Sequence, residues 1–341
     1  MIAILHVSPL EMQPCNAGQL VRVPARLLAE QASGTLLWLV ETRKGAHVAT
    51  RRMLQPTARQ VRLGSILRGL REEGAHGSQD TVASELGWSE SKLSRIEAGR
   101  LGISVDDLDR LLDRYGVKDQ GLRTYVADLR RRGNVRGWES DIRSVVSAMY
   151  ADYIGYESDA SDTYNAQTTL IPGLLQTHEY AAAVISQLVP DMDEEEKHER
   201  LAIRDRRQQA FDRPNPLVFW GVISESVFRH AVGGPAVMAT QLEHLLTLAK
   251  EYPGTINIHV LPESSESHAA LFGPFVILSF PEQWEPDIVY LEGLTSTRFL
   301  EKPEEVRAYS RLFNRLMMSE SLRGADSLKL VESHLKNYRK G

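Results

Sequence analysis

The chain has a single cysteine and no apolar run long enough to span a membrane. Cys15 is the one cysteine among 341 residues, which excludes an internal disulfide framework and a cysteine-rich zinc site. This usage fits a reducing cytoplasm. The apolar segments Ile2–Val7 and Thr35–Val40 are far shorter than the roughly 20 residues that cross a bilayer. No basic stretch precedes an apolar core, as it does in a secretory signal.

The sequence also lacks the common catalytic motifs. It contains no Walker-type phosphate loop, no G-x-S-x-G and no G-x-G-x-x-G. The His-Glu pairs that start at residues 178 and 198 begin like zinc-protease helices, but alanine stands four residues after each histidine. The second metal ligand is therefore missing. We expect no enzymatic activity, no metal and no cofactor.

Negative charge is concentrated in the C-terminal part. Residues 1–56 hold 6 Lys and Arg against 3 Asp and Glu, residues 57–138 hold 15 against 12, and residues 139–341 hold 19 against 30. The last part would repel a phosphate backbone, so only the middle part suits a nucleic-acid surface. The acidic part is expected to do something other than bind DNA.

Residues 78–99 have the pattern of a DNA-reading helix-turn-helix. Gly87 supplies a tight turn between two short helices, and Ser89 is a good N-cap for the second. Leu93 and Ile96, three residues apart, form the inward face of that second helix. The residues that can reach base edges and phosphates are Ser89, Glu90, Ser91, Lys92, Ser94 and Arg95.

Flanking helices extend this motif to a compact all-α domain over residues 57–116. Upstream, an amphipathic helix carries Arg62, Arg68 and Arg71, and downstream Ser104 caps a helix that ends near Tyr115. We predict that Arg68 contributes to DNA binding. Glu97 is expected to be structural, as the partner of an arginine or the cap of a neighbouring helix.

Residues 57–116 resemble the XRE (Cro/repressor-type) helix-turn-helix proteins. The resemblance rests on Gln79 at a helix start, Ala83, Gly87 and the S-R-I-E-A-G ending of the recognition helix. It implies that Gln79 contacts a phosphate. It also implies that Glu90, Ser91, Lys92 and Arg95 face the major groove. Glu90 has two open roles, because a carboxylate can accept from cytosine N4 but can also serve as a helix-dipole partner.

Two segments flank this domain. For residues 1–52 we weigh a flexible basic arm against upstream sequence ahead of a natural start at Met53, and we favour the second; residues 1–56 are expected to be poorly structured. Residues 117–138 are predicted to be a helical linker. The arginine run at 130–132 either lies over DNA backbone or is a solvated connector, and we favour the connector slightly.

Residues 139–341 alternate helical and strand patterns, which predicts an α+β domain with a small sheet. The whole chain is thus expected to be multidomain, with an all-α DNA-binding domain before an α+β domain. Helices are predicted near 140–158, 177–189, 193–212, 236–251, 303–318 and 325–339. Strands are predicted at Leu217–Ile223, Thr255–Leu261, Phe275–Phe280 and Ile288–Leu291.

The C-terminal part resembles the antitoxin-like C-terminal domain of a group of actinobacterial XRE-type regulators. The resemblance rests on ordered short motifs, among them I-P-G-L-L-Q-T at 171–177, R-D-R-R-Q at 204–208 and V-Y-L-E at 289–292. It implies a regulator that is commonly encoded beside a small partner protein. Candidate ligand or partner residues are Arg204, Arg207, Gln208 and Glu225.

An internal role for the same residues is equally open. The arginines of the R-D-R-R-Q motif can pair with the run Glu194–Glu196 or with Glu225, and Glu225 and Glu292 can be their buried partners. Taken together, the sequence predicts a cytoplasmic, dimeric transcriptional regulator that binds operator DNA and senses a partner protein or small ligand. The alternative is an antitoxin-like protein that sequesters a small partner and autoregulates its operon.

Overall fold

The computed structural model describes residues 56–133, 138–189, 191–265, 273–281, 285–293 and 296–340. All of these residues belong to one compact unit of the chain, Leu54–Gly341. Both interpretations of residues 1–52 lie outside the described residues. No helix in the described ranges is long and apolar enough to cross a membrane.

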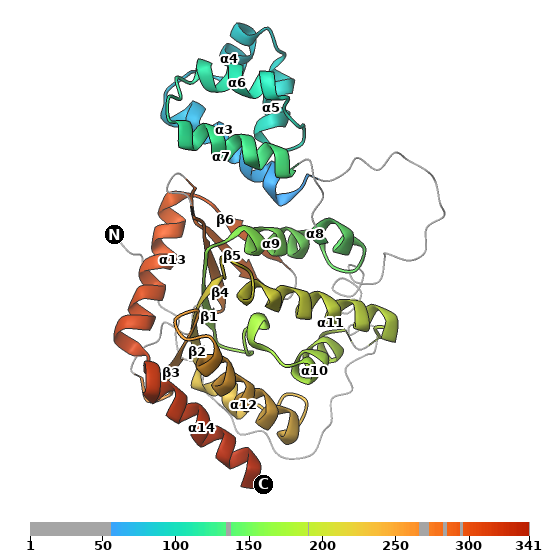
Figure 1. Ribbon diagram of the computed structural model, residues 1–341, viewed down its shortest axis with the longest axis vertical. Helices are drawn as coiled ribbons and strands as arrows, with labels where there is room; N and C mark the ends of the chain where they lie inside the picture. Colours follow the sequence, from blue (N-terminus) through green and yellow to red (C-terminus); the bar gives the residue numbers. More distant parts are fainter. Residues whose placement is uncertain are drawn as a thin grey trace, which may run out of the picture. The chain divides into compact units, whose positions relative to one another are not determined.

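Five helices form the first part of the described chain (Figure 1). They are α3 (Ala58–Glu73), α4 (Gln79–Leu86), α5 (Glu90–Glu97), α6 (Val105–Arg114) and α7 (Gln120–Gly133). Each of the first four begins at a Ser or Thr whose side chain accepts the backbone N–H three residues later. The predicted caps Ser89 and Ser104 are among them, and α4 ends at Gly87 in the left-handed conformation (φ 71°). The helix-turn-helix predicted from the sequence is confirmed.

The predicted linker is wrong in one respect, because α7 completes the core of this helical domain. Leu122, Val126 and Leu129 of α7 are buried in the same cluster as Leu67 of α3 and Leu111 of α6. The expected helix is present, but it packs against α3 instead of only connecting two domains. The apolar spacing i, i+4, i+7 was the sequence signal for this buried face.

The second part contains a six-stranded mixed sheet with the order β3-β2-β1-β4-β5-β6. Strands β1, β2 and β3 run parallel, whereas β4, β5 and β6 are joined antiparallel. The strands are β1 (Asp162–Gln167), β2 (Val218–Ser224), β3 (Ile256–Leu261), β4 (Phe275–Ser279), β5 (Ile288–Glu292) and β6 (Thr297–Leu300). This confirms the α+β class, and the sequence analysis missed β1 and β6.

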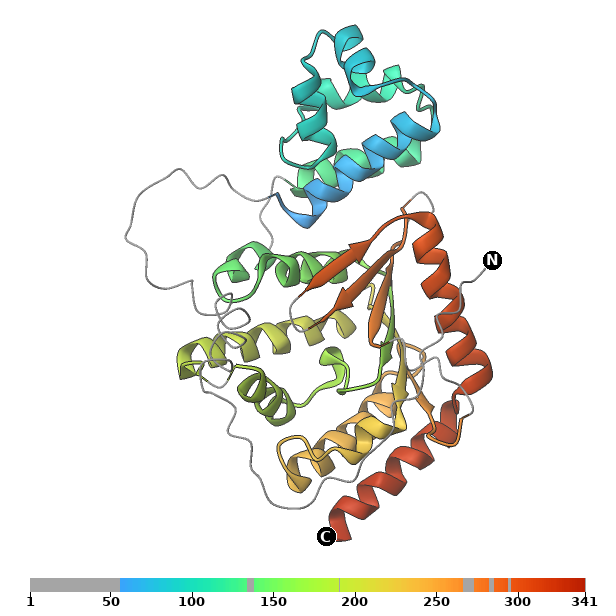
Figure 2. The same cartoon turned by 180° about the vertical axis from the view of Figure 1, so that it is seen from behind.

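Helices cover both faces of the sheet (Figures 1 and 2). One face packs on helices α9–α12 and α14 around a core that includes Phe219, Leu242 and Val331, and the other packs on α13 through Phe313. The helices are α8 (Trp138–Asp141), α9 (Ala148–Asp159), α10 (His178–Leu188), α11 (Glu194–Gln208), α12 (Pro235–Glu251), α13 (Pro303–Arg315) and α14 (Gly324–Lys340). The predicted helix over 140–158 is interrupted, because Ser147 caps a new helix there.

Candidate nucleic-acid interface

The recognition helix α5 has one buried face and one polar face. Leu93 and Ile96 are buried in the helical core. On the other side Glu90, Ser91 and Arg95 are exposed, and the Arg95 Nε donates to the Ser91 carbonyl at 3.2 Å. Ser89 caps the helix and is also exposed. The polar side thus presents short hydroxyls, one carboxylate and one guanidinium, the groups that form hydrogen bonds with base edges and phosphates.

Glu97 anchors this helix to its neighbours. Its fully buried carboxylate accepts from Arg71 Nε at 2.7 Å and from Arg71 Nη2 at 2.9 Å, and it accepts from Gln79 Nε2 at 2.7 Å. The hydrogen bond with Glu97 raises the pKa of Arg71. Arg68 Nε lies 3.8 Å from the same carboxylate and keeps a half-exposed side chain. The expected structural role of Glu97 is confirmed, and α3, α4 and α5 are joined by one buried acid.

The backbones of α3 and α5 approach each other closely at Gly64. A Cβ added there would lie 2.5 Å from the carbonyl oxygen of Glu97. This distance is too short for a nonbonded contact, so any larger residue would force the backbone to shift. Together with the Glu97 cluster, this contact fixes the position of the recognition helix on α3. Gln79 takes part in that anchoring, so its side-chain amide is already engaged and its phosphate contact stays a prediction.

Lys92 does not share the exposure of Ser91 and Arg95. Its Nζ lies 2.8 Å from Asp107 Oδ2 on α6 and 4.1 Å from the centre of the Trp88 ring. The hydrogen bond from Lys92 lowers the pKa of Asp107. Sequence position placed Lys92 on the reading face, whereas in the structure it ties α5 to α6. It would have to leave Asp107 to contact DNA.

Arg100 is a candidate DNA contact that the sequence analysis missed. It is exposed, directly follows the recognition helix and Gly99, and forms no side-chain interaction within the described ranges. A basic residue just after the glycine that ends a recognition helix was the signal available in the sequence.

Most other cations of the helical domain are paired with carboxylates. They include Arg59, Arg62, Arg71, Lys92, Arg110, Arg114, Arg123, Arg131 and Arg132.

Arg207 has a different partner from those the sequence suggested. Its Nε and Nη2 donate to the carboxylate of Glu157 on α9 at 2.7 and 2.8 Å, and both side chains are buried. Tyr153 donates to the same carboxylate at 2.7 Å. For Arg207, the alternative of pairing with Glu225, Glu292 or the run Glu194–Glu196 is therefore wrong. Arg207 serves an internal ion pair between α9 and α11.

The other candidate ligand residues are also engaged within the protein. Gln208 donates to the Gln176 carbonyl at 2.6 Å. Glu225 contacts His334 Nε2 at 3.0 Å and accepts from the Glu263 N–H at 3.0 Å. Burial disfavours the charged form of Glu225, but these two contacts outweigh it and lower its pKa.

Arg204 lies against the turn of the I-P-G-L-L-Q-T motif. A Cβ on Gly173 would lie 2.3 Å from Arg204 Nη1, so a larger residue there would displace this guanidinium. Its role in binding a ligand or partner stays a prediction. Among the described residues, no cluster of three or more His, Cys, Asp or Glu side chains is placed to hold a metal ion.

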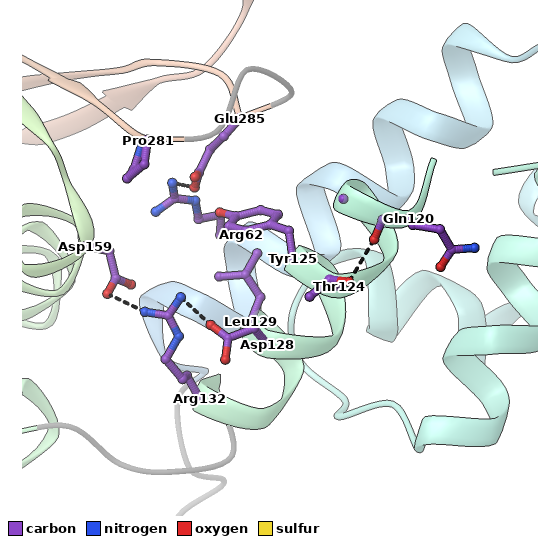
Figure 3. Close-up of a pocket in the computed structure, with 11 residues that line it drawn as sticks. Arg62, Gln120, Thr124, Tyr125, Asp128, Leu129, Arg132, Asp159, Pro281 and Glu285 are labelled. Atoms are coloured by element: carbon purple, nitrogen blue, oxygen red, sulfur yellow. Dashed lines mark hydrogen bonds and ion pairs between the residues drawn. The ribbon is translucent and has the colours of Figure 1, made fainter. Parts of the chain in front are cut away.

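A cleft of about 560 Å³ lies beside α7 (Figure 3). Charged groups of both signs line it, and they interact with each other: Arg132 pairs with Asp128 and lies 3.5 Å from Asp159, and Arg62 pairs with Glu285. The remaining wall comes from Gln120, Gly121, Thr124, Tyr125, Leu129 and Pro281.

Two family models match the chain. One, described as a helix-turn-helix domain, matches residues 62–125, which includes α5 and most of the helices around it. The other, described as a domain of unknown function (DUF5753), matches residues 150–333. No curated protein and no solved structure matches the chain significantly. The helix-turn-helix match supports a DNA-binding regulator.

Proposed function

The chain belongs to the family of the domain of unknown function DUF5753, and because a helix-turn-helix domain precedes that region, we propose a sequence-specific transcriptional regulator of the XRE type. One observation carries the proposal. The exposed side of α5 is polar, its buried side is apolar, and Glu97 fixes the helix to α3 and α4. A rigid helix with a polar outer side is the arrangement that enters a major groove.

We assign base reading to Glu90, Ser91, Ser94 and Arg95. Ser94 is half-exposed beside Arg95, one turn from Glu90 and Ser91. Phosphate contacts are assigned to Ser89, Gln79, Arg68 and Arg100 at the rim of this surface. Lys92 is assigned to support of the helix, because Asp107 and Trp88 hold it.

The protein is proposed to bind as a dimer of repressor type. Each chain offers one recognition helix and few unpaired cations, and helix-turn-helix proteins commonly reach adequate affinity by binding two half-sites one helical turn apart. The C-terminal part would join the two copies and receive a signal from a partner protein or small ligand. We assign no catalytic step to it.

The test is DNA binding by the full-length chain, measured on fragments of its own upstream region at two salt concentrations. Arg95→Ala should weaken binding to the selected site by about 1–3 kcal/mol and relax selectivity at one base pair. Lys336→Ala, which removes the same charge from an exposed position on α14, should change nothing. Equal binding to all fragments would refute sequence-specific regulation.

A second function is favoured by charge. Residues 139–341 carry 30 acidic against 19 basic residues, a surface suited to a small basic partner that the protein sequesters in an antitoxin-like manner. Co-purification of a small protein encoded next to this chain, together with weaker autoregulation when that protein is in excess, would favour this alternative. A stable, partner-free protein that still represses would count against it.

A further inference from the structure

Helix α3 is contacted on two different sides. Gly64 and Arg71 face α5. Ala58, Arg62 and Ser65 recur at i, i+4 and i+7, which places them together on another side, about 130° away around the axis at 3.6 residues per turn. Contacts with this second side of α3 therefore leave the recognition helix uncovered.

Three acids of the C-terminal part contact this second side of α3 and its flanks; we call Asp159, Glu285 and Glu301 the acidic dock. Asp159 accepts from Arg59 Nε at 2.8 Å and from Arg59 Nη2 at 3.0 Å, and the two side chains are only 11% and 15% exposed. Ser65 Oγ donates to Glu301 Oε2 at 3.1 Å.

Arg62 forms the central and most buried contact of the dock. It pairs with Glu285, both side chains are 5% exposed or less, and its guanidinium lies 3.4 Å above the Phe280 ring. Burial lowers the pKa of Arg62 to about 10, which leaves it charged at neutral pH. Ala58 adds apolar contact, since it is buried in the same core as Tyr153 of α9.

The charge of the C-terminal part explains why its acidic dock is suited to contact α3 and not DNA. The C-terminal part has a large acidic excess and would repel a phosphate backbone. At the second side of α3, Arg59 and Arg62 pair with Asp159 and Glu285 of the C-terminal part. The cations Arg68, Arg95 and Arg100 lie near the recognition helix instead. The cleft in Figure 3 borders the dock and is lined by Arg62, Asp159 and Glu285.

We propose that the acidic dock holds the helix-turn-helix domain by the second side of α3, and that the protein binds its operator with the dock closed. The proposal rests on the DNA-binding function above. In this arrangement the C-terminal part sets the orientation of the recognition helix without covering it. A change in the C-terminal part is then transmitted to DNA binding through α3.

The first test locks the dock in the full-length chain. Cys15→Ser removes the native thiol, and Ser65→Cys with Glu301→Cys places one thiol on each side of the contact. A bismaleimide reagent joins the two thiols, and operator affinity is measured by fluorescence anisotropy before and after the reaction. The matched control pair is Glu243→Cys with Arg339→Cys, whose native side chains lie 2.9 Å apart between α12 and α14.

We expect efficient cross-linking and a change of less than about threefold in operator Kd on locking, because the recognition helix stays exposed. Cross-linking no faster than between thiols on separate molecules would refute the dock. A loss of about tenfold or more that the control pair does not show would refute binding with the dock closed.

The second test opens the dock. Asp159→Asn with Glu285→Gln removes the carboxylates that pair with Arg59 and Arg62, and should raise hydrogen exchange in residues 58–66 and leave residues 79–97 unchanged. The control Asp326→Asn with Glu332→Gln removes two exposed acids of α14 and should alter neither segment. Unchanged exchange in 58–66 would contradict the dock. A parent protein without selective DNA binding would refute the proposed function, while cross-linking and exchange would still report on the dock itself.

Discussion

Operator binding should depend on salt less steeply than the many arginines of the helical domain suggest. Most of these cations are already paired with carboxylates, and three near α5 are free or only loosely held: Arg68, Arg95 and Arg100. Each phosphate contact contributes about 0.9 to the slope of log K against log salt. Because Arg95 is assigned to a base, the phosphate contacts by cations are those of Arg68 and Arg100. The expected slope is therefore about −1.8 per bound protomer, or about a 12-fold loss of affinity per protomer between roughly 50 and 200 mM salt.

Substitution of a single arginine tests this count directly. Arg100→Ala should reduce the slope by about 0.9 per protomer, because one phosphate contact is lost. Fluorescence anisotropy on an operator duplex over a series of NaCl concentrations measures both slopes, with stoichiometry determined at high protein concentration. Lys336→Ala is the matched control and should leave the slope of the parent protein.

Two results would refute the reasoning. A slope steeper than about −5 per protomer would mean that ion pairs such as Lys92 with Asp107 open when DNA binds. An unchanged slope in Arg100→Ala would mean that this guanidinium stays in solvent. In the first case Lys92→Ala should make the slope shallower by about 0.9 per protomer, which is the share of this one cation.

Three further predictions concern stability. Gly64→Ala should lower the free energy of unfolding by about 1–3 kcal/mol, because its Cβ would collide with the carbonyl at the end of α5; Gly69→Ala on the same helix meets no atom within 4 Å and should be neutral or stabilising in thermal unfolding. Arg207→Ala should cost about 3–5 kcal/mol by leaving Glu157 as an unpaired buried charge, and a smaller loss in denaturant titrations would contradict this. Glu225→Gln should destabilise the protein at pH 7. Because the native pKa is below the ordinary value of 4.5, that difference should shrink as pH falls through the native pKa, and a constant difference would count against the contact.

The helix-turn-helix was predictable because its determinants are local. N-caps, the turn at Gly87 and the apolar spacing of Leu93 and Ile96 all act within a few residues of each other. The pairing of Lys92 with Asp107 joins residues 15 positions apart on different helices, so spacing along α5 could not reveal it. Sequence position identified which side of the helix is outward, but not which outward side chain is already engaged.

Strand β1 shows the limit of pattern reading. It lies at the centre of the sheet, between β2 and β4, yet its sequence D-T-Y-N-A-Q lacks the β-branched and aromatic run typical of a strand. Thr163 and Asn165 are buried there, because pairing with both neighbours satisfies the backbone and tertiary contact overrides propensity. The partner of Arg207 was missed for a related reason, since Glu157 lies 50 residues away on another helix.

The packing of α7 on α3 has a consequence for how such proteins can be recombined. A DNA-binding module excised at Gly116 would lose the buried side chains of Leu122, Val126 and Leu129 and expose the apolar surface that they cover. The transferable module therefore extends to Gly133. Gene fusions that exchange operator specificity between relatives should be viable when the junction follows α7, and should yield insoluble or protease-sensitive chimeras when it precedes that helix.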